Sequence, residues 1–316
     1  MSFGARVLVL IVLIVAVGVL LVLTRQPGPT GGLRSAFDAE FLVRPDGYPG
    51  LGEHYSFEFP SEPKQMDPGL MYRALADGAV DVIDGFATDG RIPAYDLVVL
   101  EDDKNFFPPY YAAPLIRIGK LKEHPELGKI LNRLGEQISD ETMQKLNYEV
   151  DEKGRKAYDV ARNFLVSQQL IPADAAPGSG SAGAVTIGGK HFTEQEILGE
   201  IMAILIECSS DLGVDRRLNL GGTIICFNAL KAADIDLYAE YTGTGLVNIL
   251  KKKAVSDPDS TYRMVKQEFL ERYDLVWLEP FGFSNTYTLT MRREHARKLG
   301  IETISDLAEF INESAE

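Results

Sequence analysis

The segment Asp234-Ile-Asp-Leu-Tyr-Ala-Glu-Tyr-Thr-Gly-Thr244 places a short apolar run directly before a glycine-containing turn. The run Ile235–Tyr238 is predicted to be a strand, and a helix is expected after the turn. Open α/β sheets bind ligands at the carboxyl ends of such strands. Tyr241 and Thr244 are therefore candidates for a ligand site, although a tyrosine at this position can also simply cover the core.

The same alternation extends outward from this segment over most of the chain. Further predicted strands lie at Leu33–Phe37, Val80–Ile83, Leu97–Leu100, Val185–Ile187, Leu218–Leu220, Leu275–Trp277 and Tyr287–Met291. Predicted helices lie at Asp67–Ala76, over most of 125–170, and at Thr193–Glu207, Gly222–Ala232 and Asp259–Arg272, and further helices follow Met291 to the end of the sequence. Short strands that alternate with helices of this length indicate an α/β protein. The two halves of the chain share no repeated motif.

A second candidate is the segment Ile187-Gly-Gly-Lys-His-Phe-Thr-Glu-Gln195. A strand ends in glycines, and a helix is expected to begin near Thr193, which we predict as its N-cap. Lys190 would bring a cation to the mouth of the site. An ordinary strand-to-helix turn explains the same pattern.

Four further segments place an aromatic residue or an arginine beside Gly, Asp or Pro at a strand end. They are Glu40–Gly47 (EFLVRPDG), Val82–Ile92 (VIDGFATDGRI), Leu100–Tyr110 (LEDDKNFFPPY) and Phe281–Leu289 (FGFSNTYTL). Each alone is a weak signal, because an aromatic residue at a strand end more often belongs to the core.

Composition excludes several classes of function. The 316 residues carry a net charge of −14, whereas nucleic-acid binding needs a basic surface. The two cysteines, Cys208 and Cys226, form no CxxC pair, and the four histidines are scattered, so no metal site and no cofactor are expected. Two free thiols are the simpler interpretation, with a disulfide between them as the alternative.

The first 25 residues differ from the rest. An uncharged apolar run, Val7–Leu23, lies between Arg6 and Arg25, close to the lower length limit for a membrane-spanning helix. A cleaved signal peptide is the alternative, but the run is not followed by an Ala-x-Ala cleavage site. We expect 1–25 to anchor the protein in the inner or plasma membrane, facing the periplasmic or outer side, with 26–32 as a tether.

Residues 173–183 form a linker by composition, because they are small, polar and rich in Gly, Pro and Ser. This linker divides the remaining chain into 33–172 and 184–316.

The motifs together resemble the substrate-binding proteins of the quaternary-amine ABC uptake transporters, which bind glycine betaine, choline and proline betaine. The segments that carry the resemblance are GGKHFTEQ, NLGGT, DIDLYAEYTGTGL, FSNTYTL, EFLVRPDG, ATDGRI and LEDDKNFFPPY, and it covers Leu33–Glu316. It implies an α/β protein of the type II periplasmic-binding-protein fold, in which two lobes are joined by two crossover strands. The implied partners are a small quaternary-ammonium solute and the permease and ATPase subunits of an importer.

One departure from the family concerns the order of the motifs. Residues 33–172 resemble the family's carboxyl half, and 184–316 its amino half. We therefore predict a circular permutation, so that 33–316 form one two-lobed binding domain. The alternative is a fragment of two tandem binding domains, which carries the carboxyl half of one domain followed by the amino half of the next. The crossovers are expected near 87–96 and 280–287, with one lobe formed by about 92–172 and 184–281 and the other by 33–88 and 286–316.

The resemblance also implies the ligand site. An aromatic box would be formed by Tyr241, Tyr287, Tyr110 and Phe86, and the contacts to a ligand carboxylate by Arg44, Lys190, Thr244 and Asn285. Aromatic faces attract a quaternary ammonium, which has no hydrogen-bond donor. The planar guanidinium of arginine can donate two parallel hydrogen bonds to a carboxylate. The two cations favour a betaine over choline. Family members often have tyrosine at the Phe86 position, so the ligand or its affinity can differ here.

Two other functions compete with transport. A membrane-anchored sensor would bind the same class of solute and act through a partner. An enzyme is not expected, because the sequence has no Gly-x-Ser-x-Gly motif and no metal-spaced histidines.

Overall fold

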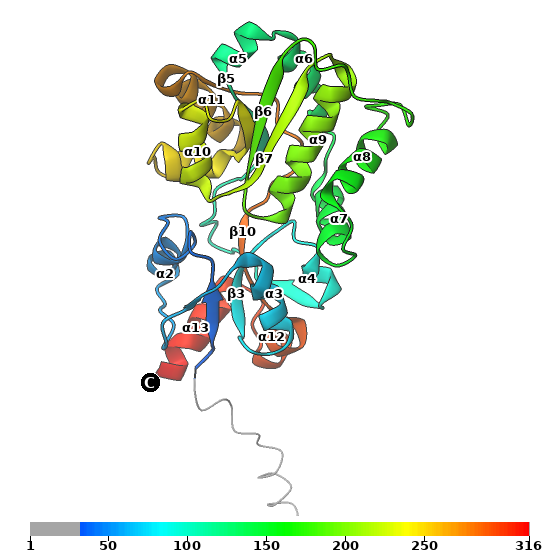
Figure 1. Ribbon diagram of the computed structural model, residues 1–316. Coiled ribbons are helices and arrows are strands. Elements are labelled where there is room, and N and C mark those ends of the chain that lie inside the picture. Colours follow the sequence, from blue (N-terminus) through cyan, green and yellow to red (C-terminus); the bar gives the residue numbers. More distant parts are fainter. Residues whose placement is uncertain (1–31, 316) are drawn as a thin grey trace, which may run out of the picture.

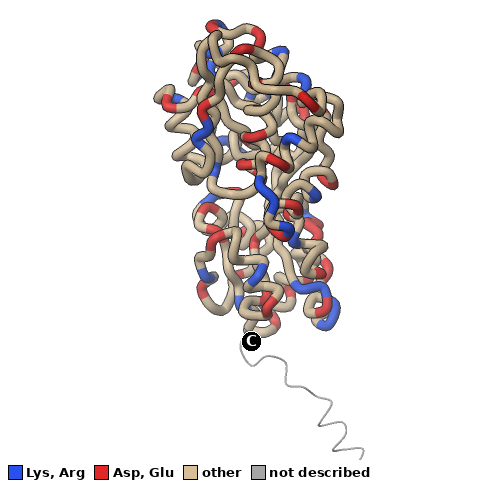
Figure 2. Tube along the Cα trace, turned by 45° about the vertical axis from the view of Figure 1, so that its right-hand side comes forward, with Lys and Arg blue, Asp and Glu red and all other residues tan. Residues whose placement is uncertain are grey.

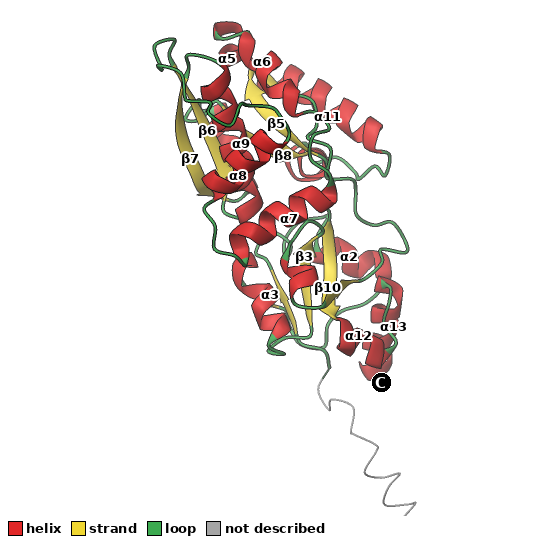
Figure 3. Ribbon diagram, turned by 90° about the vertical axis from the view of Figure 1, so that its right-hand side faces the viewer, coloured by secondary structure: helices red, strands yellow, loops and turns green. Residues whose placement is uncertain are grey.

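The structure is a computed structural model that describes residues 32–315 (Figure 1). These residues form two α/β lobes, each built on a five-stranded sheet. Helices lie on both faces of each sheet (Figure 3), which explains why the strands read as short apolar runs. The predicted α/β class and two-lobed fold are confirmed.

The first lobe, drawn at the bottom of Figure 1, contains residues 32–99 and 287–315. Its strands follow the order β2-β1-β3-β10-β4, with β10 antiparallel to both neighbours. The strand bounds are β1 Ser35–Phe37, β2 Lys64–Gln65, β3 Val82–Phe86, β4 Leu97–Val99 and β10 Tyr287–Arg292. Its helices are α2 Tyr48–Tyr55, α3 Pro68–Ala76, α4 Arg91–Ala94, α12 Arg293–Leu299 and α13 Ile304–Ala315.

The second lobe contains residues 112–277 and repeats the same arrangement, with the order β7-β6-β8-β5-β9 and an antiparallel β5. The bounds are β5 Ala112–Arg117, β6 Ala184–Lys190, β7 Gly213–Gly221, β8 Leu237–Tyr241 and β9 Leu275–Trp277. The helices are α5 Ile118–Glu123, α6 Glu126–Leu131, α7 Asp140–Asp151, α8 Ala157–Ser167, α9 Thr193–Ser209, α10 Thr223–Lys231 and α11 Pro258–Tyr273, with a 3-10 helix over Asn132–Leu134 and a π-helix over Thr244–Ile249.

The crossover segments are only partly where the sequence placed them. One runs through 278–286, as expected, but the other runs through 100–111 rather than 87–96, because β4 still pairs with β10 in the first lobe. The two segments lie side by side, joined by a bridge between Tyr111 and Ser284. The sequence analysis also missed β5, in which Pro114 lowers the apparent strand propensity.

The predicted linker connects α8 to β6 on the surface of the second lobe. Its backbone is held in place, since Gly178 N–H donates to the Glu207 carbonyl and Ala182 N–H to the Asp211 carbonyl. Cys208 lies on α9 and Cys226 on α10, and both thiols are free. Burial raises the pKa of Cys226 to about 12.

The predicted anchor at 1–25 lies outside the described residues. Within 32–315, no helix combines the length and the apolar character needed to span a bilayer.

Candidate ligand-binding site

All eight site residues named from the sequence line one cavity between the lobes. The cavity measures about 50 Å³. Its lining is completed by Asp38, Glu40, Pro68, His191, Phe192, Gly222 and Thr223. Residues of both lobes and of the crossover segments thus form the walls of this cavity.

Aromatic rings form one end of this cavity. Phe86 at the end of β3 is the register partner of Tyr287 at the start of β10, and their ring centroids are 5.6 Å apart. Tyr110, on the crossover, meets Tyr287 edge-on at 5.7 Å. Tyr241 is the last residue of β8. Sheet pairing and the hinge thus position the rings of the predicted box.

Tyr110 can reach this position because residue 243 has no side chain. A Cβ at Gly243 would lie 2.7 Å from a carbon of the Tyr110 ring. The glycine in the turn after β8 is therefore needed for the close approach of the crossover.

A fifth ring, Phe192, was missed by the sequence analysis. It stacks on Phe86 at 5.5 Å with an interplanar angle of 5° and lies 6.3 Å from Tyr241. Phe192 is also the N-cap of α9, so the prediction of Thr193 as N-cap was wrong. The Thr193 hydroxyl instead donates to Asp151 at 2.5 Å. The available signal was an aromatic residue directly before a helix within GGKHFTEQ.

The tyrosine hydroxyls remain neutral at physiological pH. Burial raises the pKa of Tyr241, Tyr110 and Tyr287 well above the ordinary value. These side chains therefore present uncharged π faces, the form that attracts a cation.

Arg44 belongs to a charged end that borders the rings: its guanidinium carbon lies 5.2 Å from the centroid of the Tyr287 ring, and the residue is only 4% exposed. Its Nε donates to Asp46 Oδ1 at 2.8 Å and its Nη2 to Asp46 Oδ2 at 2.6 Å. Nη2 also donates to Thr244 Oγ1 at 3.2 Å, and Nη1 to Glu40 Oε2 at 3.3 Å. Four of the five guanidinium donors are thus used within the protein.

Lys190 is paired in the same way. Its Nζ donates to Glu240 Oε1 at 2.6 Å, and Glu240 is fully buried. Tyr238 completes the pair by donating its hydroxyl to Glu240 Oε2 at 2.8 Å. The sequence analysis had assumed that both cations are available to a ligand carboxylate. In the structure, each is paired with a carboxylate of the protein.

Glu40 joins the two lobes. From the loop after β1 its carboxylate accepts the backbone N–H of Thr223 at 2.6 Å and the Thr223 hydroxyl at 3.0 Å. Thr223 is the first residue of α10 in the second lobe. Burial favours the neutral form of Glu40, but the charges of Lys190 and Arg44 outweigh it and lower its pKa. Glu40 is therefore ionised at neutral pH.

Glu194 lies behind the aromatic end and is 2% exposed. It accepts hydrogen bonds from the Thr88 hydroxyl at 2.5 Å, Asn147 at 3.1 Å, the Tyr241 hydroxyl at 2.7 Å and Asn285 at 2.9 Å. Burial raises its pKa above the ordinary value. One carboxylate thus fixes Tyr241 and Asn285 and ties them to the first lobe.

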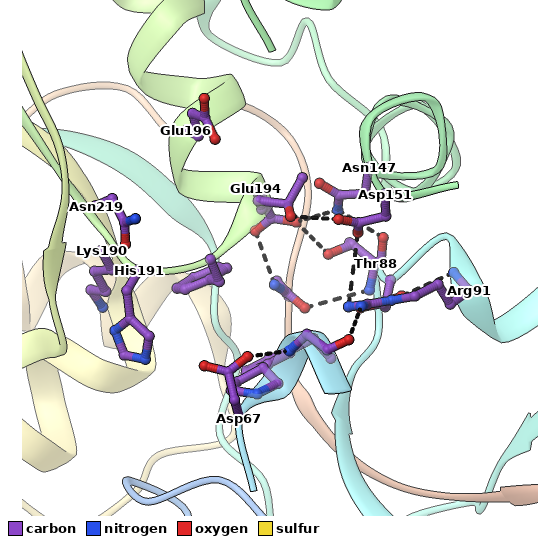
Figure 4. A pocket seen from close by; sticks show the side chains of 17 residues that line it. Asp67, Thr88, Arg91, Asn147, Asp151, Lys190, His191, Glu194, Glu196 and Asn219 are labelled. Carbon is purple, nitrogen blue, oxygen red and sulfur yellow. Dashed lines mark hydrogen bonds and ion pairs between the residues drawn. The ribbon is translucent and has the colours of Figure 1, made fainter. Parts of the chain in front are cut away.

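Glu194 and three of its partners, Thr88, Asn147 and Asn285, also line a second cavity of about 220 Å³ (Figure 4). Glu194, Asn147, Asp151 and Thr88 converge on one side of it, while Lys190, His191 and Asn219 lie on the other. Phe86, Phe192 and Asn285 line both cavities, so the aromatic pair forms the wall between them.

The residues 32–315 contain no group of three His, Cys, Asp or Glu side chains arranged to hold a metal ion. Basic and acidic segments are interspersed over both lobes in Figure 2. Between the lobes, aromatic rings and paired charges lie in contact, with Arg44 over Tyr287 and Lys190 over Tyr241.

Two lobes with the same strand order, two crossover segments and a cavity at the hinge define a solute-binding protein of the type II periplasmic-binding-protein fold. The chain belongs to the family described as the substrate binding domain of the ABC-type glycine betaine transport system, which matches residues 23–167 and 183–315.

Several curated proteins are similar to parts of the chain. A carnitine transport binding protein of Listeria monocytogenes, OpuCC, is 48% identical over 134 residues, which are 42% of this chain and 43% of that protein. A glycine-betaine-binding protein of Pseudomonas aeruginosa is 39% identical over 158 residues, half of each chain. An ergothioneine transport permease/ergothioneine binding protein of Helicobacter pylori is 42% identical over 126 residues, which are 40% of this chain and 23% of that protein.

Each match to the first two relatives spans about half of their length or less. Among solved structures, that of a glycine betaine/carnitine/choline ABC transporter is 42% identical over 43% of this chain and 50% of the other, with a TM-score of 0.35.

Proposed function

We propose that this protein is the extracytoplasmic solute-binding component of an ABC importer for quaternary-ammonium osmoprotectants. The observation that carries the proposal is the set of aromatic rings that line a buried cavity at the hinge. Tyr241, Tyr287, Tyr110 and Phe86 form the box, and Asn285 and Thr244 are polar contacts beside it.

The box suits a trimethylammonium group for a physical reason. Such a group cannot donate a hydrogen bond, so it gains little from carboxylates and amides alone. Each desolvated aromatic face contributes about 0.5–2 kcal/mol of cation–π attraction. Several faces together can outweigh the cost of removing water from the cation.

Binding is coupled to closure of the lobes. The bonds Glu40–Thr223, Arg44–Thr244 and Thr88–Glu194 all join the first lobe to the second. A solute that fills the box adds further contacts to both sides and shifts the hinge equilibrium to the closed form. The closed form is the one we propose to be recognised by the permease, which works with an ATPase.

Residues 1–25 are proposed to anchor the protein in the membrane, and 26–32 to form its tether. The two blocks 33–172 and 184–316 are proposed to be one circularly permuted binding domain. The family matches the chain in two blocks that the linker separates, and both blocks contribute strands to both sheets. A monomer that binds one solute in analytical ultracentrifugation would agree with this, whereas binding only by a dimer would favour a slice of a tandem pair.

Isothermal titration calorimetry of the full chain tests the binding function. Glycine betaine, choline, carnitine and proline betaine are titrated separately, and at least one should bind with a one-to-one stoichiometry. The variant Tyr241→Ala should bind that solute at least tenfold more weakly. The exposed Tyr158 on α8 gives a matched control, Tyr158→Ala, with unchanged affinity. No heat with any of the four solutes would refute the proposed ligand class.

A further inference from the structure

Phe192 lies where the two cavities between the lobes meet, and it lines both of them. Its ring stacks on that of Phe86, with the centroids 5.5 Å apart and an interplanar angle of 5°. Phe86 ends β3 in the first lobe, whereas Phe192 precedes α9 in the second. The wall that the two rings form is therefore complete only where the lobes meet.

The backbone on each side holds these two rings in place. The Phe192 carbonyl accepts the N–H of Gln195 at 3.0 Å and that of Glu196 at 3.4 Å, which ties the residue to the start of α9. The Phe86 N–H donates to the hydroxyl of the fully buried Tyr72 at 2.8 Å. Since both rings are attached to hydrogen-bonded backbone, the wall has a defined position beside the box.

The two cavities that the rings separate differ in chemistry. On the inner side, the lining also includes Tyr241, Tyr287 and Tyr110. On the outer side, Phe86 and Phe192 are the only Phe, Tyr or Trp side chains among the described residues that line the cavity. The Asp, Glu, Lys and Arg residues of the outer lining are Asp67, Asp89, Asp151, Glu194, Glu196, Arg91 and Lys190. A substituent that passed the rings would thus leave an aromatic environment for a polar and mainly acidic one.

We propose that Phe192 is a specificity-determining residue that sets the upper size limit of the solute. Its ring closes the box on the side of the outer cavity, so N-methyl groups are accepted, whereas a longer N-substituent meets the stacked rings. Removing the ring joins the box to the outer cavity, where carboxylates can accept a hydrogen bond from a hydroxyl at the end of the substituent. This inference rests on the proposed function and adds a residue that discriminates between solutes of one class.

Two ligands that differ only in one N-substituent test this size limit. The compact ligand is the tightest binder among glycine betaine, choline, carnitine and proline betaine. The long ligand is its analogue with a hydroxybutyl group in place of one N-methyl group. Both are titrated into the full chain by calorimetry. The original protein should bind the compact ligand about tenfold more tightly or better, because the added methylenes meet a closed wall.

The variant Phe192→Ala tests the residue itself. It makes room for the long substituent, so the ratio of the two affinities should shift toward the long ligand by about tenfold. Phe192→Leu keeps part of the apolar volume and should shift the ratio less, in the same direction. Tyr158→Ala, at the exposed position on α8, should leave the ratio unchanged. Circular dichroism and the urea midpoint establish that each variant is folded, and if alanine prevents folding, the shift with leucine decides.

The outcomes separate this inference from the proposed function. A folded Phe192→Ala protein with the affinity ratio of the original would assign the ring to general packing and overturn the size limit. An original protein that binds both ligands equally would overturn it as well. In either case the proposed function stands. Binding of none of the four solutes would overturn the proposed function and the size limit together.

Discussion

Two neighbouring parts of the cavity are built in different ways: the charged end, which is Arg44 and Lys190 with their carboxylates, and the aromatic end, which is the rings that these cations lie over. At the charged end, Arg44 and Lys190 are held by buried carboxylates at 2.6–2.8 Å, so their hydrogen bonds are used within the protein. At the aromatic end, Tyr287 contacts Phe86 and Tyr110 at centroid distances of 5.6 and 5.7 Å, and the Arg44 guanidinium lies over its ring at 5.2 Å. From this difference we expect that the charged end stabilises the closed protein, and we propose that the aromatic end provides affinity for the solute.

The largest expected effect comes from breaking the charged end. Arg44→Leu leaves Asp46, which is 3% exposed, with only the Tyr110 hydroxyl as a partner. Loss of one member of a buried ion pair typically costs about 3–5 kcal/mol, and we expect this decrease in the free energy of unfolding. Urea denaturation without ligand measures it.

The exposed pair Arg293–Asp96 provides the control, because its side chains are 55% and 78% exposed. Arg293→Leu should cost less than about 1 kcal/mol. If Arg44→Leu were equally mild, the charged end would not be a structural element, and Arg44 would again be available to a ligand.

The next effect belongs to the aromatic end. Tyr287→Ala removes a ring that contacts Phe86 and Tyr110 and also lies under the Arg44 guanidinium at 5.2 Å. Affinity for any quaternary-ammonium ligand should fall about tenfold to thirtyfold, which corresponds to about 1.4–2 kcal/mol. The conservative Tyr287→Phe should stay within about threefold in the same titration. A large loss with phenylalanine would mean that the hydroxyl, not the π face, is recognised.

The positions of the rings around the cavity followed from the sequence more directly than the pairing of its cations. Tyr241, Tyr287, Tyr110 and Phe86 each stand at a strand end or crossover within a motif, and strand ends are set by local pattern. The pairing of Arg44 with Asp46 depends on side-chain rotamers, and the pairing of Lys190 with Glu240 on the neighbouring strands β6 and β8. No spacing rule shows whether a cation has such a partner.

The same limit applies to the fold. Strand β10 was predicted close to its observed position, because apolar residues alternate with threonines over Tyr287–Met291. The strand predicted at Val80–Ile83 only overlaps β3, which continues through Asp84 and Gly85 to Phe86. The crossover was misplaced, since the sequence does not show that β4 still pairs with β10 after the turn that follows β3. Phe192 was overlooked for a similar reason: its place in the box follows from the position of α9 against the other lobe.

A third prediction concerns Glu194, which supports the aromatic end from behind. Its pKa in the folded protein is raised by burial, so the folded state binds a proton more readily than the unfolded state. Its contribution to stability is therefore greatest below the unfolded pKa, near 4.5, and is lost as pH rises through the folded pKa. The variant Glu194→Gln should lose less stability than the original protein over this rise in pH.

Urea midpoints at several pH values from 4 to 8 measure the effect. Glu196→Gln is the matched control, because Glu196 lies in the same first turn of α9 but is exposed. Parallel stability curves for the original protein and Glu194→Gln would show that this carboxylate does not titrate differently in the folded state.

The smallest effect is expected from adding a hydroxyl to the box. Phe86→Tyr keeps the π face, which stacks on Phe192 at 5.5 Å and contacts Tyr287 at 5.6 Å. Because the cation is attracted by the face, affinity should change by less than about threefold in calorimetric titration. Phe86→Leu keeps most of the apolar volume but removes the face, and should weaken binding about tenfold. If tyrosine strengthened binding tenfold while leucine changed nothing, the aromatic end would act through hydrogen bonds, and the division between the two ends would fail.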